Sequence, residues 1–214
     1  MNYIYLDNCA TTMPDDRVVN KMNEIMRVRY YNPHAFYRNA LDNEKLIDSV
    51  RRQLAGMTLG QADVVFTGSG TEADNLAVIG SLRGNGGHIV TSKGEHPAVY
   101  ETFKALENKG WNVDYIGLNP DGTVRMGELE CKLKPETLLV SIMHVSNETG
   151  AINDINGIKN VMSRVCPGAL LHSDGVQAFG HVETAGLKAD MYSISAHKIH
   201  GPKGIGALVV KKGI

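Results

Sequence analysis

Short runs of apolar, mostly β-branched residues alternate along this chain with longer amphipathic stretches, and this alternation is the strongest constraint on its fold. Such short runs are typical of buried strands, and the amphipathic stretches are typical of helices. The pattern predicts strands at residues 63–67, 88–91, 112–117, 138–143, 169–173, 191–195 and 206–210. It predicts helices at 72–82, 98–108, 126–133 and 155–165, and two more before the first strand, at 15–28 and 41–54. Strands that alternate with crossover helices build a mostly parallel sheet with helices on both faces, so the predicted class is α/β with seven strands.

Charge and composition exclude several kinds of partner. The chain has 22 Lys and Arg against 23 Asp and Glu, so it has no excess of basic residues for direct nucleic-acid binding. No apolar run approaches the roughly 18 residues that span a bilayer, and no secretory signal precedes the first acid, so we expect a cytoplasmic protein without a membrane partner. The cysteines, Cys9, Cys131 and Cys166, lack the spacing of a disulfide framework or a zinc site and are expected to be reduced thiols. We expect Cys9 to be a small buried residue and not a nucleophile.

A glycine-rich loop, TGSGTEADN at residues 67–75, runs from the first predicted strand into a helix. Free backbone N–H groups and the positive end of the helix dipole would make the loop around Gly70 and Thr71 an anion site. The spacing Gly68-x-Gly70-x-x-Ala73 also fits a dinucleotide fingerprint, although this pattern alone is weak. An ordinary helix cap by Ser69 or Thr71 is the third interpretation.

Two later strands are followed by side chains that suggest one cofactor. Asp174 comes at the end of LLHSDGVQ (170–177), and Lys198 lies between His197 and His200 in SISAHKIHGPKG (193–204). Because the carboxyl ends of parallel strands share one edge of a sheet, we expect both to face the glycine-rich loop. Pyridoxal phosphate (PLP) needs an amine for a Schiff base, a carboxylate for its ring nitrogen and donors for its phosphate. The two histidines beside Lys198 are expected to favour its reactive neutral amine.

A metal site is the competing interpretation of these residues. His172, Asp174, His197 and His200 could supply ligands. Lys198 would place a positive charge among them, and the chain has no HExxH motif, so PLP is favoured.

Two further loops are expected to reach the same pocket. Residues 95–97 (EHP) follow the second strand, where the imidazole of His96 could lie over a pyridine ring. Residues 146–150 (SNETG) follow the fourth strand, where Asn147 could donate to the phenolic oxygen of PLP. Each loop alone could equally be a turn or a helix cap.

Six segments together resemble, in order and spacing, the cysteine desulfurases of the NifS/IscS type. These enzymes belong to the class V aminotransferase group of fold-type I PLP enzymes. The segments are LDNCATT (6–12), GSGTEADN (68–75), GEHPAV (94–99), HVSNETG (144–150), HSDGVQ (172–177) and SAHKIHGPKGIG (195–206). The resemblance implies a PLP-binding large domain at 61–214, on which an N-terminal arm and helices at 1–60 pack. It also implies that the small C-terminal domain of the family lies outside this sequence.

The resemblance implies roles for particular residues. Lys198 resembles the lysine that bonds PLP, and His96 resembles the ring-stacking residue that also moves protons; these are the expected catalytic residues. Asp174 resembles the partner of the ring nitrogen. The remaining expected cofactor ligands are Gln177 and Asn147 at the phenolic oxygen, and Gly70, Thr71, Ser195 and His197 at the phosphate. No metal is expected.

The implied activity is the PLP-dependent conversion of L-cysteine to L-alanine, with persulfide sulfur passed to an acceptor protein, for example in iron–sulfur cluster assembly. The implied assembly is a homodimer. In the family, the catalytic cysteine loop and the arginine that binds the substrate carboxylate lie after the segments matched here. We therefore expect this chain alone to bind PLP without releasing sulfur. The alternatives are a selenocysteine lyase or another class V aminotransferase, and a non-catalytic scaffold that binds a second polypeptide.

Overall fold

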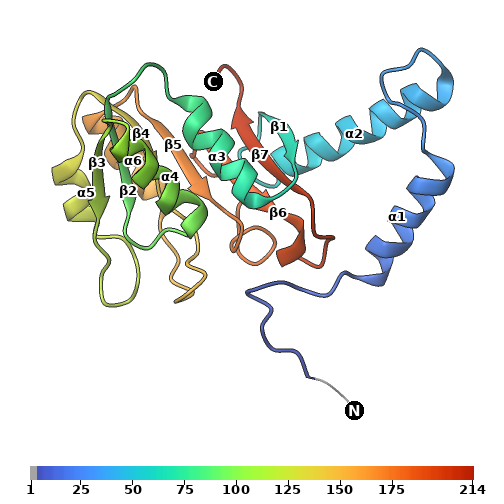
Figure 1. Ribbon diagram of the computed structural model, residues 1–214, viewed down its shortest axis with the longest axis horizontal. Coiled ribbons are helices and arrows are strands. Elements are labelled where there is room, and N and C mark those ends of the chain that lie inside the picture. The colour runs from blue at the N-terminus through green and yellow to red at the C-terminus, as the bar shows by residue number, and fades with distance from the viewer. Residues whose placement is uncertain (1–3) are drawn as a thin grey trace.

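One seven-stranded sheet forms the centre of the molecule in the computed structural model, which describes residues 4–214 (Figure 1). The strands are β1 (Ala62–Thr67), β2 (His88–Ser92), β3 (Asn112–Ile116), β4 (Thr137–Ser141), β5 (Leu170–Asp174), β6 (Met191–Ser195) and β7 (Gly206–Lys211). They follow the order β1-β7-β6-β5-β4-β2-β3. All neighbours from β6 to β3 are parallel, and β7 is antiparallel to both β6 and β1. The predicted class, an α/β fold with a mostly parallel seven-stranded sheet, is confirmed.

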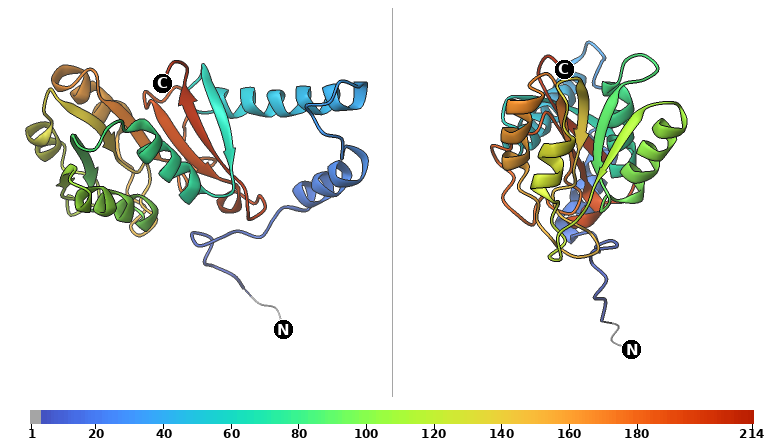
Figure 2. Two further views of the ribbon diagram at one scale, coloured as in Figure 1. Left: turned by 45° about the horizontal axis from the view of Figure 1, so that its top comes forward. Right: turned by 90° about the vertical axis from the view of Figure 1, so that its left-hand side faces the viewer.

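Helices cover both faces of this sheet, as Figure 2 shows with the sheet seen between them. They are α1 (Asp16–Val28), α2 (Arg38–Gly56), α3 (Gly70–Ser81), α4 (Pro97–Asn108), α5 (Met126–Lys132) and α6 (Ile155–Val165), with a 3-10 turn η1 (Ala196–Lys198). Helix α3 begins two residues before the predicted start at residue 72. The reason is local: the Ser69 hydroxyl accepts a hydrogen bond from the Glu72 N–H at 3.1 Å and caps the helix directly after the glycine-rich loop.

The core consists of two apolar layers, one on each face of the sheet. Ala77 of α3 and Phe103 of α4 pack in the same cluster as Ile89 of β2. On the other face, Ile158 of α6 packs in a cluster with Leu171 of β5. Because successive side chains of a strand point to opposite faces, the apolar residues of the buried strands supply both layers at once. Each Å² of apolar surface that is buried stabilises the fold by about 25 cal/mol. These two apolar layers therefore hold in place the strands whose ends carry the site.

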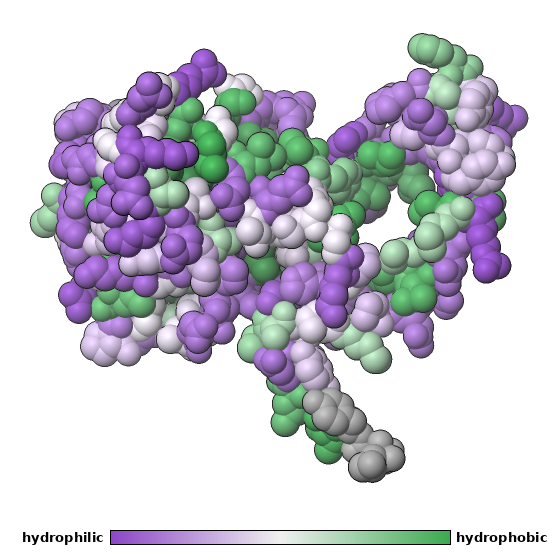
Figure 3. Space-filling view, viewed as in Figure 1, coloured by the Kyte–Doolittle hydropathy of each residue, from purple (hydrophilic) through white to green (hydrophobic). Residues whose placement is uncertain are grey.

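The N-terminal part extends away from the sheet. Helix α2 contacts β1, whereas α1 has no buried residue. Figure 3 shows an open space between these helices and the body, and its lining includes Met22, Val50 and Ile199. The division into an arm at 1–60 and a large domain at 61–214 stays a prediction. Of the helices within residues 4–60, α2 is the one that makes substantial contact with the sheet.

Asp190 joins three segments at the start of β6. Its carboxylate forms ion pairs with Lys159 and, at 3.2 Å, with Lys211, and it accepts a hydrogen bond from the Leu171 N–H at 2.8 Å. Removing the Asp190 carboxylate leaves both lysines without this opposite charge and the Leu171 N–H without its acceptor. We expect Asp190→Ala to lower the free energy of unfolding by about 2–3 kcal/mol, since both lysines can still turn toward water.

Chemical denaturation of the two chains measures this loss. The matched control is Asp48→Ala, which breaks an exposed pair with Arg51 and should cost less than about 0.5 kcal/mol. Equal losses in the two variants would contradict a structural role for the buried pair.

Candidate active site

A cavity of about 530 Å³ lies at the edge of the sheet where most strands end at their carboxyl side. All nine site residues expected from the sequence line it: Gly70, Thr71, His96, Asn147, Asp174, Gln177, Ser195, His197 and Lys198. The topology brings them together because β1, β2, β4, β5 and β6 all run toward this edge. The size of the cavity is that of an ordinary small-molecule pocket. The roles of the nine residues as cofactor ligands stay predictions.

One end of the cavity fits an anion. The N-terminus of α3 opens into it at Gly70, where a side chain would not fit, because a Cβ would lie 2.6 Å from the Val176 side chain. The Ser195 hydroxyl also lines this end, is buried and has no hydrogen-bond partner within residues 4–214. An unpartnered buried hydroxyl is costly, so a ligand acceptor at this position would satisfy it. Free N–H groups and a free hydroxyl are the donors that a phosphate needs.

The Lys198 amine lies against the N-terminal segment. Its Nζ donates hydrogen bonds to the carbonyl oxygens of Cys9 and, at 2.9 Å, Ala10. The amide of Gln177 donates to the same Cys9 carbonyl at 2.9 Å. Cys9 and Ala10 therefore form part of the cavity wall, and their carbonyls hold the lysine at it.

The segment that carries Lys198 is fixed by further contacts with the N-terminal segment. The His197 carbonyl accepts a hydrogen bond from the Thr12 N–H at 2.8 Å, and its ring shares one with the Thr11 hydroxyl at 3.1 Å. Partial burial and the neighbouring Lys198 charge lower the pKa of His197. His200 adopts a left-handed backbone, with φ of 62°, and its N–H donates to the Thr12 hydroxyl at 2.7 Å. This strained turn is held in place by the contacts with residues 11–13.

Asp174 is buried on the floor of the cavity. One of its carboxylate oxygens accepts a hydrogen bond from the Val176 N–H at 2.9 Å. Burial, followed by repulsion from Asp74, raises the pKa of Asp174 to about 7. A cationic ring nitrogen beside this carboxylate would reverse that shift, since an opposite charge favours the ionised form.

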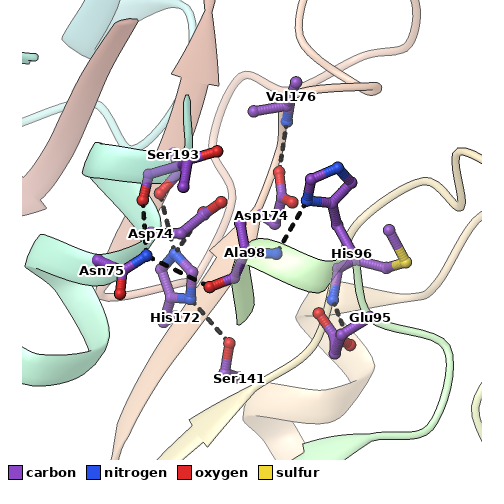
Figure 4. Close-up of polar contacts among 12 residues, drawn as sticks. Asp74, Asn75, Glu95, His96, Ala98, Ser141, His172, Asp174, Val176 and Ser193 are labelled. Atoms are coloured by element: carbon purple, nitrogen blue, oxygen red, sulfur yellow. Dashed lines mark hydrogen bonds and ion pairs between the residues drawn. The ribbon is translucent and has the colours of Figure 1, made fainter. Parts of the chain in front are cut away.

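His96 and Asn147 lie at the cavity from two other loops. The His96 ring caps α4: its Nδ1 accepts a hydrogen bond from the Ala98 N–H at 3.1 Å, so that a neutral ring carries its proton on Nε2 (Figure 4). The Asn147 amide donates to the Glu148 carboxylate at 2.9 Å. In this arrangement Asn147 is bonded within its own loop, and contact with a ligand would require that bond to be exchanged.

The structure corrects the expectation for Cys9. This residue is exposed at the wall of the cavity, and its thiol donates to the Asp7 carboxylate at 3.3 Å. The prediction of burial was wrong because residues 6–10 run along the outer edge of the body, where no helix or strand covers them.

The four residues of the alternative metal site do not converge. The His172 ring is fully buried and bonds Ser141, while the His200 ring bonds the Met13 carbonyl. Across residues 4–214, no cluster of three or more His, Cys, Asp or Glu side chains is arranged to hold a metal ion.

Two buried carboxyl groups behind Asp174 were not picked out from the sequence. Asp74, on α3, lies 3.5 Å from His172 Nε2, and Glu95 accepts a hydrogen bond from the Met143 N–H at 3.0 Å (Figure 4). Burial raises the pKa of Asp74 to about 7 and that of Glu95 to about 8. The same burial lowers the pKa of His172 to about 4. An acid beside Ala73 on the inner face of a helix was the one available signal for Asp74.

Almost the whole sequence also matches one known protein family. Residues 4–214 match the model of the aminotransferase class-V family. The chain belongs to the class-V aminotransferase family. Among curated members of this family, the cysteine desulfurase IscS of Pseudomonas fluorescens (strain Pf0-1) is 42% identical over 98% of this chain. The predicted resemblance to NifS/IscS-type cysteine desulfurases is thus confirmed.

Several solved structures share the fold of this chain. A NifS-like protein superposes with a TM-score of 0.91 at 33% identity, covering 99% of this chain and 60% of that one. The structure of SspA in complex with cysteine gives 0.84 at 32% identity, with 97% and 61% covered. The chain spans about half the length of the curated relatives it matches, 54% of the Pseudomonas protein. None of the helices within 4–214 combines the length and apolar character needed to cross a membrane.

Proposed function

We propose that this chain binds PLP and forms the cofactor-binding part of a cysteine desulfurase. The observation that carries the proposal is the shared cavity: Lys198, Asp174 and the unpartnered Ser195 hydroxyl all face it. These are an amine, a buried carboxylate and a phosphate donor, the three groups that PLP requires. The class-V family and the IscS relatives support the same assignment.

PLP, when bound, supplies an aldehyde that bonds amines and a ring that takes up electrons from the substrate. The α3 N-terminus at Gly70, with Thr71, Ser195 and His197, would hold the phosphate. Asp174 would hold the proton on the ring nitrogen, and Gln177 and Asn147 would donate to the phenolic oxygen. Each of these residues lines the cavity.

Lys198 and His96 are the groups that would handle protons. The Cys9 and Ala10 carbonyls would accept hydrogen bonds from the Lys198 amine whenever it is not bonded to the cofactor. The ring of His96 is oriented by the Ala98 N–H, which leaves Nε2 free to donate or accept at the cavity. A histidine is well suited to this role because its ordinary pKa lies near neutral pH.

The finer parts of the assignment follow from the relatives. L-Cysteine is the proposed substrate, and one similar structure, SspA, is a complex with cysteine. The proposed product sulfur goes to an acceptor protein, with iron–sulfur assembly as the destination that the IscS name suggests. A homodimer, a cytoplasmic location and the inability of this chain alone to release sulfur stay predictions.

Reductive trapping tests the cofactor site. We expect borohydride treatment of the PLP-incubated chain, followed by peptide mass mapping, to place the reduced cofactor on Lys198. The neighbouring Lys203 serves as an internal control because it lies outside the cavity lining. An unmodified Lys198 would overturn the proposal and favour a non-catalytic scaffold.

The exposed thiol at the cavity wall provides an independent signal. Bound PLP should slow alkylation of Cys9, whereas alkylation of Cys131, which is also exposed, should proceed at an unchanged rate. Equal rates for Cys9 with and without PLP would argue against occupancy of this cavity.

A further inference from the structure

Gly175, directly after Asp174, is the glycine within residues 4–214 at which an added Cβ would come closest to another side chain. A Cβ built on Gly175 would lie 2.0 Å from Cζ of Tyr192 and 2.4 Å from its hydroxyl oxygen. The Tyr192 ring therefore fills the space that any other residue at 175 would need. Gly175 has no positive φ, so the requirement for glycine here is purely steric.

Tyr192 is locked in this position. It lies on β6, is fully buried, and its hydroxyl shares a hydrogen bond with His144 Nδ1 at 2.9 Å. Burial and the nearby Asp174 charge raise the pKa of Tyr192, and burial lowers the pKa of His144. Both partners are therefore neutral, and the ring acts as a rigid, uncharged support.

The backbone of Asp174 and Gly175 is held on both sides of that support. The Asp174 carbonyl accepts a hydrogen bond from the His144 N–H at 2.9 Å, and the Gly175 N–H donates to the Ser193 carbonyl at 2.9 Å. These residues flank Tyr192 or bond to it. The Tyr192 ring thus lies beside a peptide that is bonded at one end to the loop after β4 and at the other end to β6.

We propose that Tyr192 is a positioning residue that acts through Gly175 to hold the Asp174 carboxylate at the ring nitrogen of the cofactor. This inference rests on the proposed function. Groups that bind a ligand must be held within about 0.5 Å of their working position. The Tyr192 ring limits how closely the 174–175 peptide can approach β6, and it thereby fixes the position of Asp174. Tyr192 touches neither cofactor nor substrate in this role, since it does not line the cavity.

A compensating pair of substitutions tests the contact. We expect Gly175→Ala to weaken PLP binding about tenfold or more, because the added methyl group pushes the 174–175 peptide away from Tyr192. Adding Tyr192→Met makes room for that methyl, and the double variant should bind within about threefold of the unsubstituted chain. Tyr192→Phe keeps the ring and should leave PLP binding nearly unchanged. Affinity is measured by titration of the absorbance of bound PLP, on protein shown to be folded by circular dichroism.

The absorbance spectrum separates positioning from simple support of the fold. If Tyr192 only stabilised the fold, Gly175→Ala and Tyr192→Met would lower the melting temperature while the folded fraction bound PLP with unchanged affinity and spectrum. That result, or a double variant as weak as Gly175→Ala, would overturn the inference. Failure of the unsubstituted chain to bind PLP would instead overturn the proposed function. We expect a shifted pH midpoint of the bound-PLP absorbance in Tyr192→Met, because a displaced Asp174 no longer holds the ring proton.

Discussion

Replacing Asp174 by alanine should weaken PLP binding by about 100-fold. Removing one partner of a buried charge pair costs about 2–5 kcal/mol, and each 1.4 kcal/mol is a factor of ten in affinity. Asp174 is 5% exposed, so water cannot substitute for its carboxylate at the ring nitrogen. Direct titration of the variant and the unsubstituted chain with PLP measures the ratio.

The charge and the shape of Asp174 can be separated. Asp174→Asn keeps an oxygen that can accept from the Val176 N–H, so it should fold normally and still lose most of the PLP affinity. Asp48→Asn removes an exposed carboxylate on α2 and is the matched control, with unchanged binding expected. If Asp174→Asn bound PLP as tightly as the unsubstituted chain, the carboxylate would have no role at the ring nitrogen.

The positions of Asp174 and Lys198 could be predicted because they depend on local sequence. Asp174 is the last residue of β5, and Lys198 lies in the turn directly after β6. Parallel strands bring their carboxyl ends to one edge whatever else surrounds them. The start of α3 was predictable for the same reason, to within two residues, from the glycines and hydroxyls at 67–71. Local patterns fix both the strand ends and the helix cap.

Contacts between distant segments could not be predicted in this way. The exposure of Cys9 depends on what covers residues 6–10, and no pattern near Cys9 specifies that. The fit of Tyr192 against Gly175 joins two strands and is invisible to periodicity, because an aromatic residue in a buried strand is ordinary. Asp74 has no local pattern that marks it as part of the site, and only the packing of α3 on β5 places it beside His172.

Three buried carboxyl groups in and beside the cavity should make the ligand-free chain less stable as the pH rises. Burial raises the pKa of Asp74 and Asp174 to about 7 and that of Glu95 to about 8, whereas in the unfolded chain such groups ionise near pH 4. Between these values the folded chain binds more protons than the unfolded chain, so raising the pH favours unfolding. His172, with its pKa lowered to about 4, has the opposite effect, but only below about pH 6.5.

From pH 6 to pH 8.5 we therefore expect the free energy of unfolding to fall by about 5 kcal/mol, seen as a fall of about 15 °C in Tm by scanning calorimetry. Glu95→Gln should flatten this dependence, because glutamine keeps an acceptor for the Met143 N–H and never has to ionise. Glu44→Gln, at an exposed position of α2, should leave it unchanged. A Tm that stayed constant or rose over this range would contradict protonated carboxyls beneath the cavity. Saturating PLP should also reduce this fall in Tm, because a cationic ring nitrogen beside Asp174 favours the ionised carboxylate. Asp174 would then no longer contribute to the loss of stability at high pH.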